Sequence, residues 1–325
     1  MPLSVRTWCL AAALALGTLG SAPATAQDPY PSQNVRFVVA FPAGGPTDAV
    51  GRILGQRLQD KWGQGVVIEN RGGAGGNIAA RQVAKAEANG YTLLVTTSAY
   101  AVNPSLSKNA GYVPETDYKT VIVAGTTPNI FVASPQLKAS NLKELFELAK
   151  TEKLTYGMPG PGTTPHLSAE RMFRIIGQVD IPAVPFTGAA PLLNALLGGH
   201  ITLACQAMSP TIEHIKAGKL KALAVLSDKR VPSLPDVPTA LEQGFGEGEE
   251  ATWIALFAPA ATPVPVLTRL NTDLNAVLAE GPIRERFEQI GVLPVGGPLA
   301  ASETYVHAEI KKWGEVVRKI GLKIE

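Results

Sequence analysis

Short apolar strands alternate with helical stretches along most of this sequence, and this alternation constrains the fold more than any other feature. Strand and helix patterns follow one another over residues 35–41, 49–61, 66–69, 78–86 and 91–96. A strand–helix–strand rhythm of this kind is typical of a mainly parallel sheet covered by helices. The rhythm returns between residues 121 and 225, which predicts a second sheet of the same type.

The chain is long enough to predict two lobes. Its 325 residues, less 26 at the N-terminus, leave 299, and chains longer than about 250 to 300 residues usually divide into domains. Connections rich in proline and glycine near residues 125–128 and 227–238 are the expected crossings between the lobes. The predicted organisation is a signal peptide over residues 1–26, a first lobe of residues 27–124 plus 232–325, and a second lobe of residues 125–231.

The N-terminus has the order of a secretory signal peptide. Arg6 precedes an apolar run from Trp8 to Leu19, and small residues follow at 24–26. The apolar run is shorter than the roughly 20 residues that a membrane-spanning helix needs. We therefore expect cleavage near Gln27 and secretion into the periplasm.

The balance of charge favours small molecules as partners and argues against nucleic acid. When Arg6 is subtracted from the 29 basic residues, 28 remain against 27 acidic ones, so the secreted chain lacks the basic stripe of a nucleic-acid-binding protein. Beyond the signal segment Cys205 is the one cysteine, which excludes an intrachain disulfide. Neither a metal nor a cofactor is expected, because no metal-site spacing links the histidines His200, His214 and His307.

The most informative segment, residues 35–48, leads from a β-branched strand through a double glycine into a helix. If Gly45 caps this helix, Pro46 takes the first helical position, which suits proline because an N–H there would have no partner. The N–H groups of the first turn, helped by about half a positive charge from the helix dipole, suit a carboxylate or phosphate. An ordinary strand-to-helix turn is the alternative to this anion site, whose candidate residues are Phe41, Ala43, Gly44, Gly45, Pro46, Thr47 and Asp48.

Asp48 has two interpretations. At the third helical position its carboxylate can bond back to the cap and interact favourably with the helix dipole. This local role is preferred over ligand contact, and both interpretations stay open.

Residues 156–167 repeat the arrangement of strand, glycine loop and helix in the second half of the chain. Thr163 and Thr164 can cap a helix and offer hydroxyl groups, and Pro165 again favours a first helical turn. Together with residues 186–191, this loop predicts a wall opposite the first one. A ligand would then lie between helix starts of both lobes, at the carboxyl ends of parallel strands where such folds bind ligands.

A further glycine-rich segment, residues 70–77, raises the alternative of a nucleotide site. Its spacing does not fit, because Gly73 and Gly75 are followed by Ile78 where the dinucleotide fingerprint needs a third glycine. A tight turn that opens a helix beside the site is the preferred interpretation.

His166 suggests catalysis, in a periplasmic hydrolase with Ser98 or Ser168 as the nucleophile. The Gly-x-Ser-x-Gly motif is missing from the sequence, however, and an ordinary helix pair explains Glu170, four residues after His166. A histidine that caps or pins the helix start is the preferred interpretation. Since no cluster of nucleophile, base and oxyanion donor is apparent, we expect no catalytic residues and no enzyme.

Ordered motifs over nearly all of the secreted chain resemble the Bug receptors, the TctC-like substrate-binding proteins of tripartite tricarboxylate transporters. These motifs include Phe41-Pro-Ala-Gly-Gly-Pro-Thr-Asp48, Val66-Val-Ile-Glu-Asn-Arg71, Gly90-Tyr-Thr-Leu-Leu94, Leu196-Leu-Gly-Gly199 and Leu234-Pro-Asp-Val-Pro-Thr239. So many matches in the same order make the resemblance specific.

The resemblance implies an α/β fold of the type II periplasmic binding-protein class. Its two lobes, each a mainly parallel sheet flanked by helices, are hinged around a cleft like a Venus flytrap. It also implies a monomeric receptor that captures a small carboxylate for membrane permease subunits. Besides the first loop, the candidate ligand contacts are then Thr97, Ser98, Ala99, Gly160, Gly162, Thr163, Thr164, His166, Phe186, Thr187, Gly188 and Ala189.

The chain departs from the family in the second lobe. The family commonly has Tyr, a basic residue and Gly where this chain has Phe186-Thr187-Gly188, and often Asp where Asn194 stands. The ligand therefore stays open among amino-dicarboxylates, di- or tricarboxylates and aromatic acids. A sensor that presents its closed form to a membrane kinase shares the fold and remains a further alternative.

Overall fold

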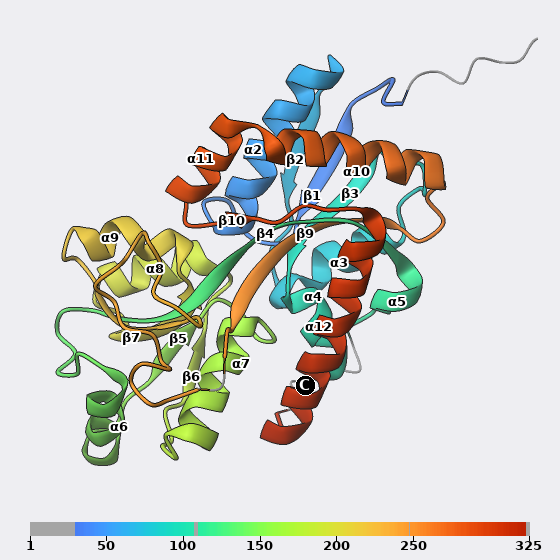
Figure 1. Cartoon of the computed structure of the whole chain (residues 1–325). Coiled ribbons are helices and arrows are strands. Elements are labelled where there is room, and N and C mark those ends of the chain that lie inside the picture. The colour runs from blue at the N-terminus through green and yellow to red at the C-terminus, as the bar shows by residue number, and fades with distance from the viewer. Residues whose placement is uncertain (1–29, 107–109, 247, 323–325) are drawn as a thin grey trace, which may run out of the picture.

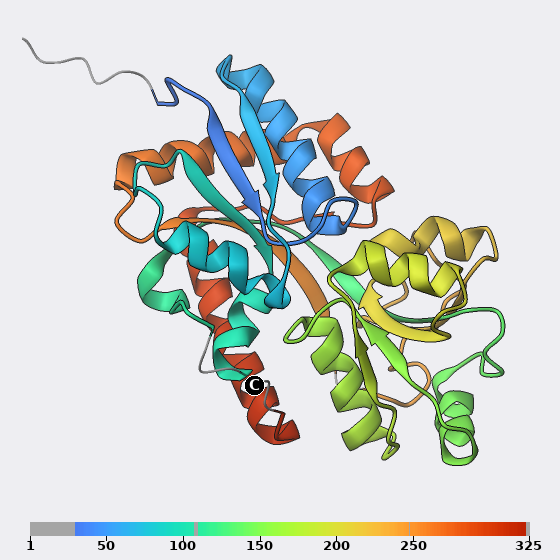
Figure 2. The same cartoon turned by 180° about the vertical axis from the view of Figure 1, so that it is seen from behind.

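One long strand, β4 (Tyr118–Ala133), runs through the centre of the molecule and belongs to both of its sheets. The computed structural model describes residues 30–106, 110–246 and 248–322, so the expected signal peptide lies outside the described residues. Figure 1 and Figure 2 show two α/β lobes, joined where β4 and β9 (Ala251–Pro259) pass between them.

The first sheet has the strand order β2–β1–β3–β9–β4–β10. Strands β1, β2 and β3 are parallel, whereas β9 runs antiparallel to its neighbours β3 and β4. Along β1, Phe37 faces one helical layer and Val38 the other, as the two-residue period of a strand requires. The bounds are β1 (Val35–Val39), β2 (Val66–Asn70), β3 (Thr92–Thr97) and β10 (Leu293–Pro294).

Helices cover both faces of this sheet. On one face Leu54 of α2 and Phe287 of α11 are fully buried in the apolar layer that α10 also covers (Figure 1). On the other face Val83 of α3 and Tyr100 of α4 pack with α12. The bounds are α2 (Pro46–Trp62), α3 (Asn77–Ala84), α4 (Ala99–Leu106), α5 (Pro114–Asp117), α10 (Val264–Ala279), α11 (Gly281–Gln289) and α12 (Leu299–Ile320).

The second sheet has the strand order β8–β4–β7–β5–β6. On one face of this sheet, Phe173 of the π-helical turn η3 packs in an apolar layer with α6 and α7. On the other face, Leu192 of α8 packs in an apolar layer with α9. The bounds are α6 (Leu142–Thr151), β5 (Tyr156–Met158), α7 (Thr164–Glu170), η3 (Arg171–Ile176), β6 (Ala183–Pro185), α8 (Ala189–Leu197), β7 (Leu203–Ala207), α9 (Ile212–Lys216) and β8 (Lys221–Leu226).

The first expected crossing, near residues 125–128, lies within the continuous strand β4. The chain stays extended as β4 and pairs with β9 through this region, with irregular register next to Gly125. A Cβ on Gly125 would lie 2.6 Å from Val292 and 2.8 Å from the carbonyl oxygen of Leu293. Glycine therefore allows a close approach here while the strand continues.

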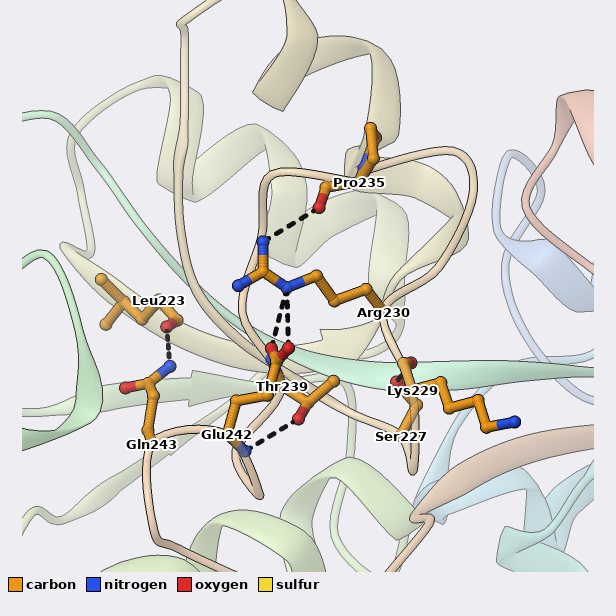
Figure 3. Close-up of polar contacts among 8 residues, drawn as sticks. All are labelled: Leu223, Ser227, Lys229, Arg230, Pro235, Thr239, Glu242 and Gln243. Carbon is orange, nitrogen blue, oxygen red and sulfur yellow. Dashed lines mark hydrogen bonds and ion pairs between the residues drawn. The ribbon is translucent and has the colours of Figure 1, made fainter.

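The segment that leads from the second lobe back to β9 stays packed on the second lobe beyond the expected crossing at 227–238. Leu234 is buried against the α8 and α9 layer, and Ala240 is buried in the opposite layer of the same lobe. Figure 3 shows Arg230 donating to both carboxylate oxygens of Glu242, at 3.0 and 2.9 Å. We therefore propose that the second lobe continues to about residue 245 and that the chain returns just before β9.

Thr239 offers a test of how this segment is held. The hydroxyl of Thr239 is buried and accepts from the Glu242 N–H at 3.0 Å, while the Thr239 N–H donates to the Glu242 carboxylate at 2.8 Å. Thr239→Ala should lower the free energy of unfolding by about 1 to 2 kcal/mol, because it removes the acceptor. Urea unfolding measures this, with Thr239→Ser as the matched control. An alanine variant as stable as the wild type would contradict the assigned role.

Candidate ligand-binding cleft

The cap expected at Gly45 is present. Gly45 has extended backbone angles (φ −86°, ψ 170°), and α2 begins with Pro46 at its first position. The N–H groups of Thr47 and Asp48 in this first turn have no acceptor within the helix. Together with the helix dipole, they are suited to stabilise an anion at the end of β1.

Asp48 has the local role that the sequence favours. Its buried carboxylate accepts hydrogen bonds from the N–H of Gly44 at 3.0 Å, from Arg52 at 3.0 Å and from Asn70 at 2.9 Å. Burial opposes the charged form, but these three donors outweigh it and hold the pKa of Asp48 below its ordinary value. The Gly44 N–H is therefore already engaged, which narrows the anion site to the backbone from Gly45 onward.

The second lobe presents two further helix starts. Thr163 caps α7, and its hydroxyl donates to the Gly160 carbonyl at 2.8 Å. Gly188 caps α8 in an extended conformation, and a Cβ there would lie 2.9 Å from Pro42 of the first lobe. The absence of a side chain at Gly188 thus lets α8 approach the loop that leads into α2.

His166 pins the glycine loop, as the preferred sequence interpretation predicts. Its Nδ1 accepts a hydrogen bond from the Gly162 N–H at 3.2 Å, which places the ring proton of the neutral form on Nε2. Burial, with a smaller effect from the positive charge of Arg174, lowers the pKa of His166 to about 4. The imidazole is therefore neutral at pH 7.

A narrow cavity of about 30 Å³ lies between these helix starts and opens to solvent. None of the described residues that line it has a charged side chain. Its polar side chains are all threonines, and the rest are proline, alanine, glycine or phenylalanine. The lining residues are Phe41, Pro42, Gly45, Pro46, Thr47, Thr97, Pro159, Thr163, Pro165, Ala189, Ala207 and Thr252.

The two lobes touch across the cleft. The hydroxyls of Ser98 in the first lobe and Thr164 in the second are 2.8 Å apart. Deeper in, Leu167 of α7 packs in a buried cluster with Val102 of α4 and Trp313 of α12. The cleft is therefore in a closed arrangement.

The structure places the sequence-predicted residues in three groups. The first lines the cavity: Phe41, Gly45, Pro46, Thr47, Thr97, Thr163 and Ala189. The second lies where the lobes approach each other: Gly44, Ser98, Gly160, Gly162, Thr164 and Gly188. The third group is not among the residues that line the cavity. Asp48, Ala99 and His166 are buried, Ala43 and Thr187 are exposed, and Phe186 packs in the apolar layer beneath α8.

Sequence reasoning missed several cavity residues. Pro42, Pro159 and Pro165 belong to motifs already singled out, so the same loops could have indicated them. Ala207 and Thr252 come from the end of β7 and from the crossing strand β9. No sequence signal marks this second pair, because their position depends on how the two sheets meet.

The groups required by a hydrolase do not come together in the described part of the chain. Ser168 accepts a hydrogen bond from Asn129 at 3.0 Å, Ser98 bonds Thr164, and neither serine is bonded to His166. The described residues contain no group of three His, Cys, Asp or Glu side chains that could hold a metal ion. None of the helices in the described ranges is long and apolar enough to span a membrane.

Comparison with known sequences finds one family over most of the chain. The family described as "Tripartite tricarboxylate transporter family receptor" (TctC) matches residues 50–322. Protein BugT of Bordetella pertussis is similar to this chain, with 34% identity over 314 residues that cover 95% of this chain and 96% of BugT.

Several solved structures are similar to this chain over most of its length. The periplasmic binding protein BugD has a TM-score of 0.87 and 36% identity, covering 91% of this chain and 100% of BugD. A protein of R. palustris with adipate has a TM-score of 0.86 and 36% identity, with 90% and 99% covered. MatC from Rhodopseudomonas palustris with bound malate has a TM-score of 0.84 and 32% identity, with 89% and 100% covered. The periplasmic binding-protein fold expected from the sequence is thereby confirmed.

The neutral, buried His166 predicts a loss of stability in acid. Because its pKa falls from 6.5 to about 4 on folding, the unfolded chain binds a proton between these pH values that the folded chain does not. The neutral His166 side chain therefore contributes to the free energy of unfolding in full above pH 6.5. This contribution, roughly 3 kcal/mol, is lost as the pH falls toward 4. His166→Asn, which keeps an acceptor near Gly162, should remove this part of the pH dependence in denaturant unfolding. An unchanged pH dependence in the variant would refute the assignment.

Gly75 tests the closed arrangement. It has φ +62°, and a Cβ there would lie 2.3 Å from the carbonyl oxygen of Pro161 in the other lobe. Gly75→Ala should therefore hold the cleft partly open and weaken ligand binding by about 10- to 100-fold. Gly63→Ala is the matched control, because Gly63 has φ +67° and no atom within 4 Å of an added Cβ. Calorimetry and small-angle scattering measure both variants, and equal affinity and radius of gyration would argue against closure at this contact.

Proposed function

The chain belongs to the family of tripartite tricarboxylate transporter receptors, and from this premise we propose that it captures a small carboxylate in the periplasm for uptake. Proteins of this family are transport receptors rather than enzymes. The ligand would lie in the cavity between the lobes, with its carboxylate at the first turn of α2.

The observation that carries this proposal is a cavity with several helix starts and no charged side chain on its wall. Arg52, the nearest cation on α2, already pairs with Asp48 and Asn70. An anion there would be held by backbone N–H groups and helix dipoles, which bind carboxylates without a counter-charge. Similar proteins bound to adipate and to malate support a carboxylate as the ligand.

Delivery to a membrane permease follows from the same proposal. We infer that residues 1–26 direct secretion, that the mature chain acts as a monomer, and that permease subunits of the tripartite type receive the closed, loaded form. The two lobes that meet across the cleft support this inference, since hinge closure around a ligand is the usual signal of a loaded receptor.

A panel of mono-, di- and tricarboxylates at millimolar concentration should contain at least one compound that raises the melting temperature. A ligand at one hundred times its dissociation constant stabilises the folded state by about 2.7 kcal/mol. The protein must first be unfolded and refolded to release any copurified ligand. No shift with any carboxylate would overturn the proposed function.

Arg52→Ala is the control for how the anion is held. Because Arg52 is committed to Asp48, its removal should change the dissociation constant by less than about tenfold. Loss of binding in a folded Arg52→Ala variant would indicate an arginine clamp in place of the backbone site.

A further inference from the structure

The two lobes face each other on both sides of the crossing strands. On one side Thr252 and Ala207 line the cleft, and they are the register partners of Thr127 and Asn129 on β4. Pro128 lies between these two on the strand, so its side chain points to the opposite side, as the two-residue period of a strand requires. There it lines a separate cavity between the lobes, which we call the rear cavity.

The rear cavity has a volume of about 400 Å³ and opens to solvent. Among the described residues that line it, only Ser233 and Glu288 have polar side chains, so its walls can come together without burying many unpaired polar groups. The second lobe contributes Met208, Val231 and Ser233 to these walls, and the first lobe contributes Glu288, Gly291 and Leu293.

The cleft is far narrower than the rear cavity. Its volume of about 30 Å³ has room for about two water molecules, at roughly 10 to 15 Å³ each. A small carboxylate needs more room, so the lobes must separate at the cleft before it can enter, and this step rests on the proposed function. Because the crossing strands lie between the two spaces, a rotation that widens the cleft brings the walls of the rear cavity together.

The first-lobe wall of the rear cavity is a fixed turn. Gly291 ends α11 with φ +68° in a Schellman motif. Its N–H donates to the carbonyl of Glu288, and the N–H of Val292 donates to the carbonyl of Phe287, both at 2.9 Å. The side chains of Val292 and Phe287 are fully buried in the apolar layer of the first lobe, so the turn moves with that lobe.

The second lobe touches this turn beside the start of α9 (Figure 1). A Cβ on Gly291 would lie 2.2 Å from Cδ1 of Ile212 and 3.2 Å from Cα of Ser209. Ile212 is buried in the layer beneath α8 and α9. Both sides of the contact are therefore held by packed layers, and only glycine leaves enough space for them to meet.

We propose that the rear cavity and the contact between Gly291 and Ile212 limit how far the cleft opens. The cavity narrows as the cleft widens, and the contact at its edge stops the rotation. This assigns a function to residues that lie on the far side of the crossing strands and do not touch the ligand site.

Tryptophan substitutions that fill the rear cavity test this proposal. Ser233→Trp fills it from the second lobe and Glu288→Trp fills it from the first, so each should hold the cleft narrower than in the wild type. Ser233→Ala and Glu288→Gln are the matched controls, because they change the same side chains without adding bulk. Each protein is first unfolded and refolded to release any copurified ligand.

The measurement is the distance between spin labels on α2 and α8, attached through Gln56→Cys and Asn194→Cys. Both positions are exposed, whereas Cys205 is buried and stays unlabelled. The mean distance should be shorter by more than about 2 Å in each tryptophan variant than in its control. Equal or longer distances in both tryptophan variants would overturn the proposal.

Alanine at the contact itself gives a second test. Gly291→Ala should shorten the same distance, whereas Gly75→Ala, at the cleft, should lengthen it. Gly63→Ala is the control for backbone strain, because Gly63 has φ +67° and no atom within 4 Å of an added Cβ. If Gly291→Ala and Gly75→Ala shift the distance in the same direction, the rear contact does not oppose opening and the proposal falls. No ligand is added in these measurements, so a carboxylate panel that fails would overturn the proposed function and leave their result unaffected.

Discussion

The backbone pairing of β4 with β9 is the constraint on which the rest of the structure depends. These strands remain paired from Tyr118 to Pro128, and β4 then continues into the second sheet. Each lobe has helices on both faces of its own sheet, and a smaller buried cluster that includes Leu167 and Trp313 is shared between the lobes. The crossing strands therefore set which loops of the two lobes face each other across the cleft.

Uncharged residues make up the described wall of the cavity between the lobes. The ionisable side chains near the cleft are paired with one another, as Asp48 is with Arg52 and as Arg174 is with Glu170. Burial of an unpaired cation in the cavity would be costly, whereas a helix start presents N–H groups that the helix leaves unpaired in any case. The cleft can thus accept an anion without storing an uncompensated charge in the empty state.

Glycines and hydroxyls have separate tasks where the lobes meet. Gly75 and Gly162 stand where an added Cβ would lie 2.3 Å from Pro161 and 1.8 Å from Asn103, so they allow the lobes to approach. The hydroxyls of Ser98, Thr164 and Thr252 are hydrogen-bonded in series across this contact. The Thr252 hydroxyl also donates to the side chain of Asn129. The contact between the lobes is therefore made in part by groups that belong to the crossing strands.

The sequence alone determined the α/β class, the division into two lobes and the start of α2 at Pro46, because strand and helix periodicity, chain length and the Gly-Gly-Pro cap are local properties. It also predicted the local roles of Asp48 and His166, whose partners Gly44 and Gly162 lie four residues away. Only the tertiary structure decided that β4 is one strand, that residues 231–245 pack on the second lobe, and that Thr252 and Ala207 reach the cavity. These features come from contacts between residues far apart in the chain, such as Thr252 with Asn129, and no local pattern encodes such a pairing.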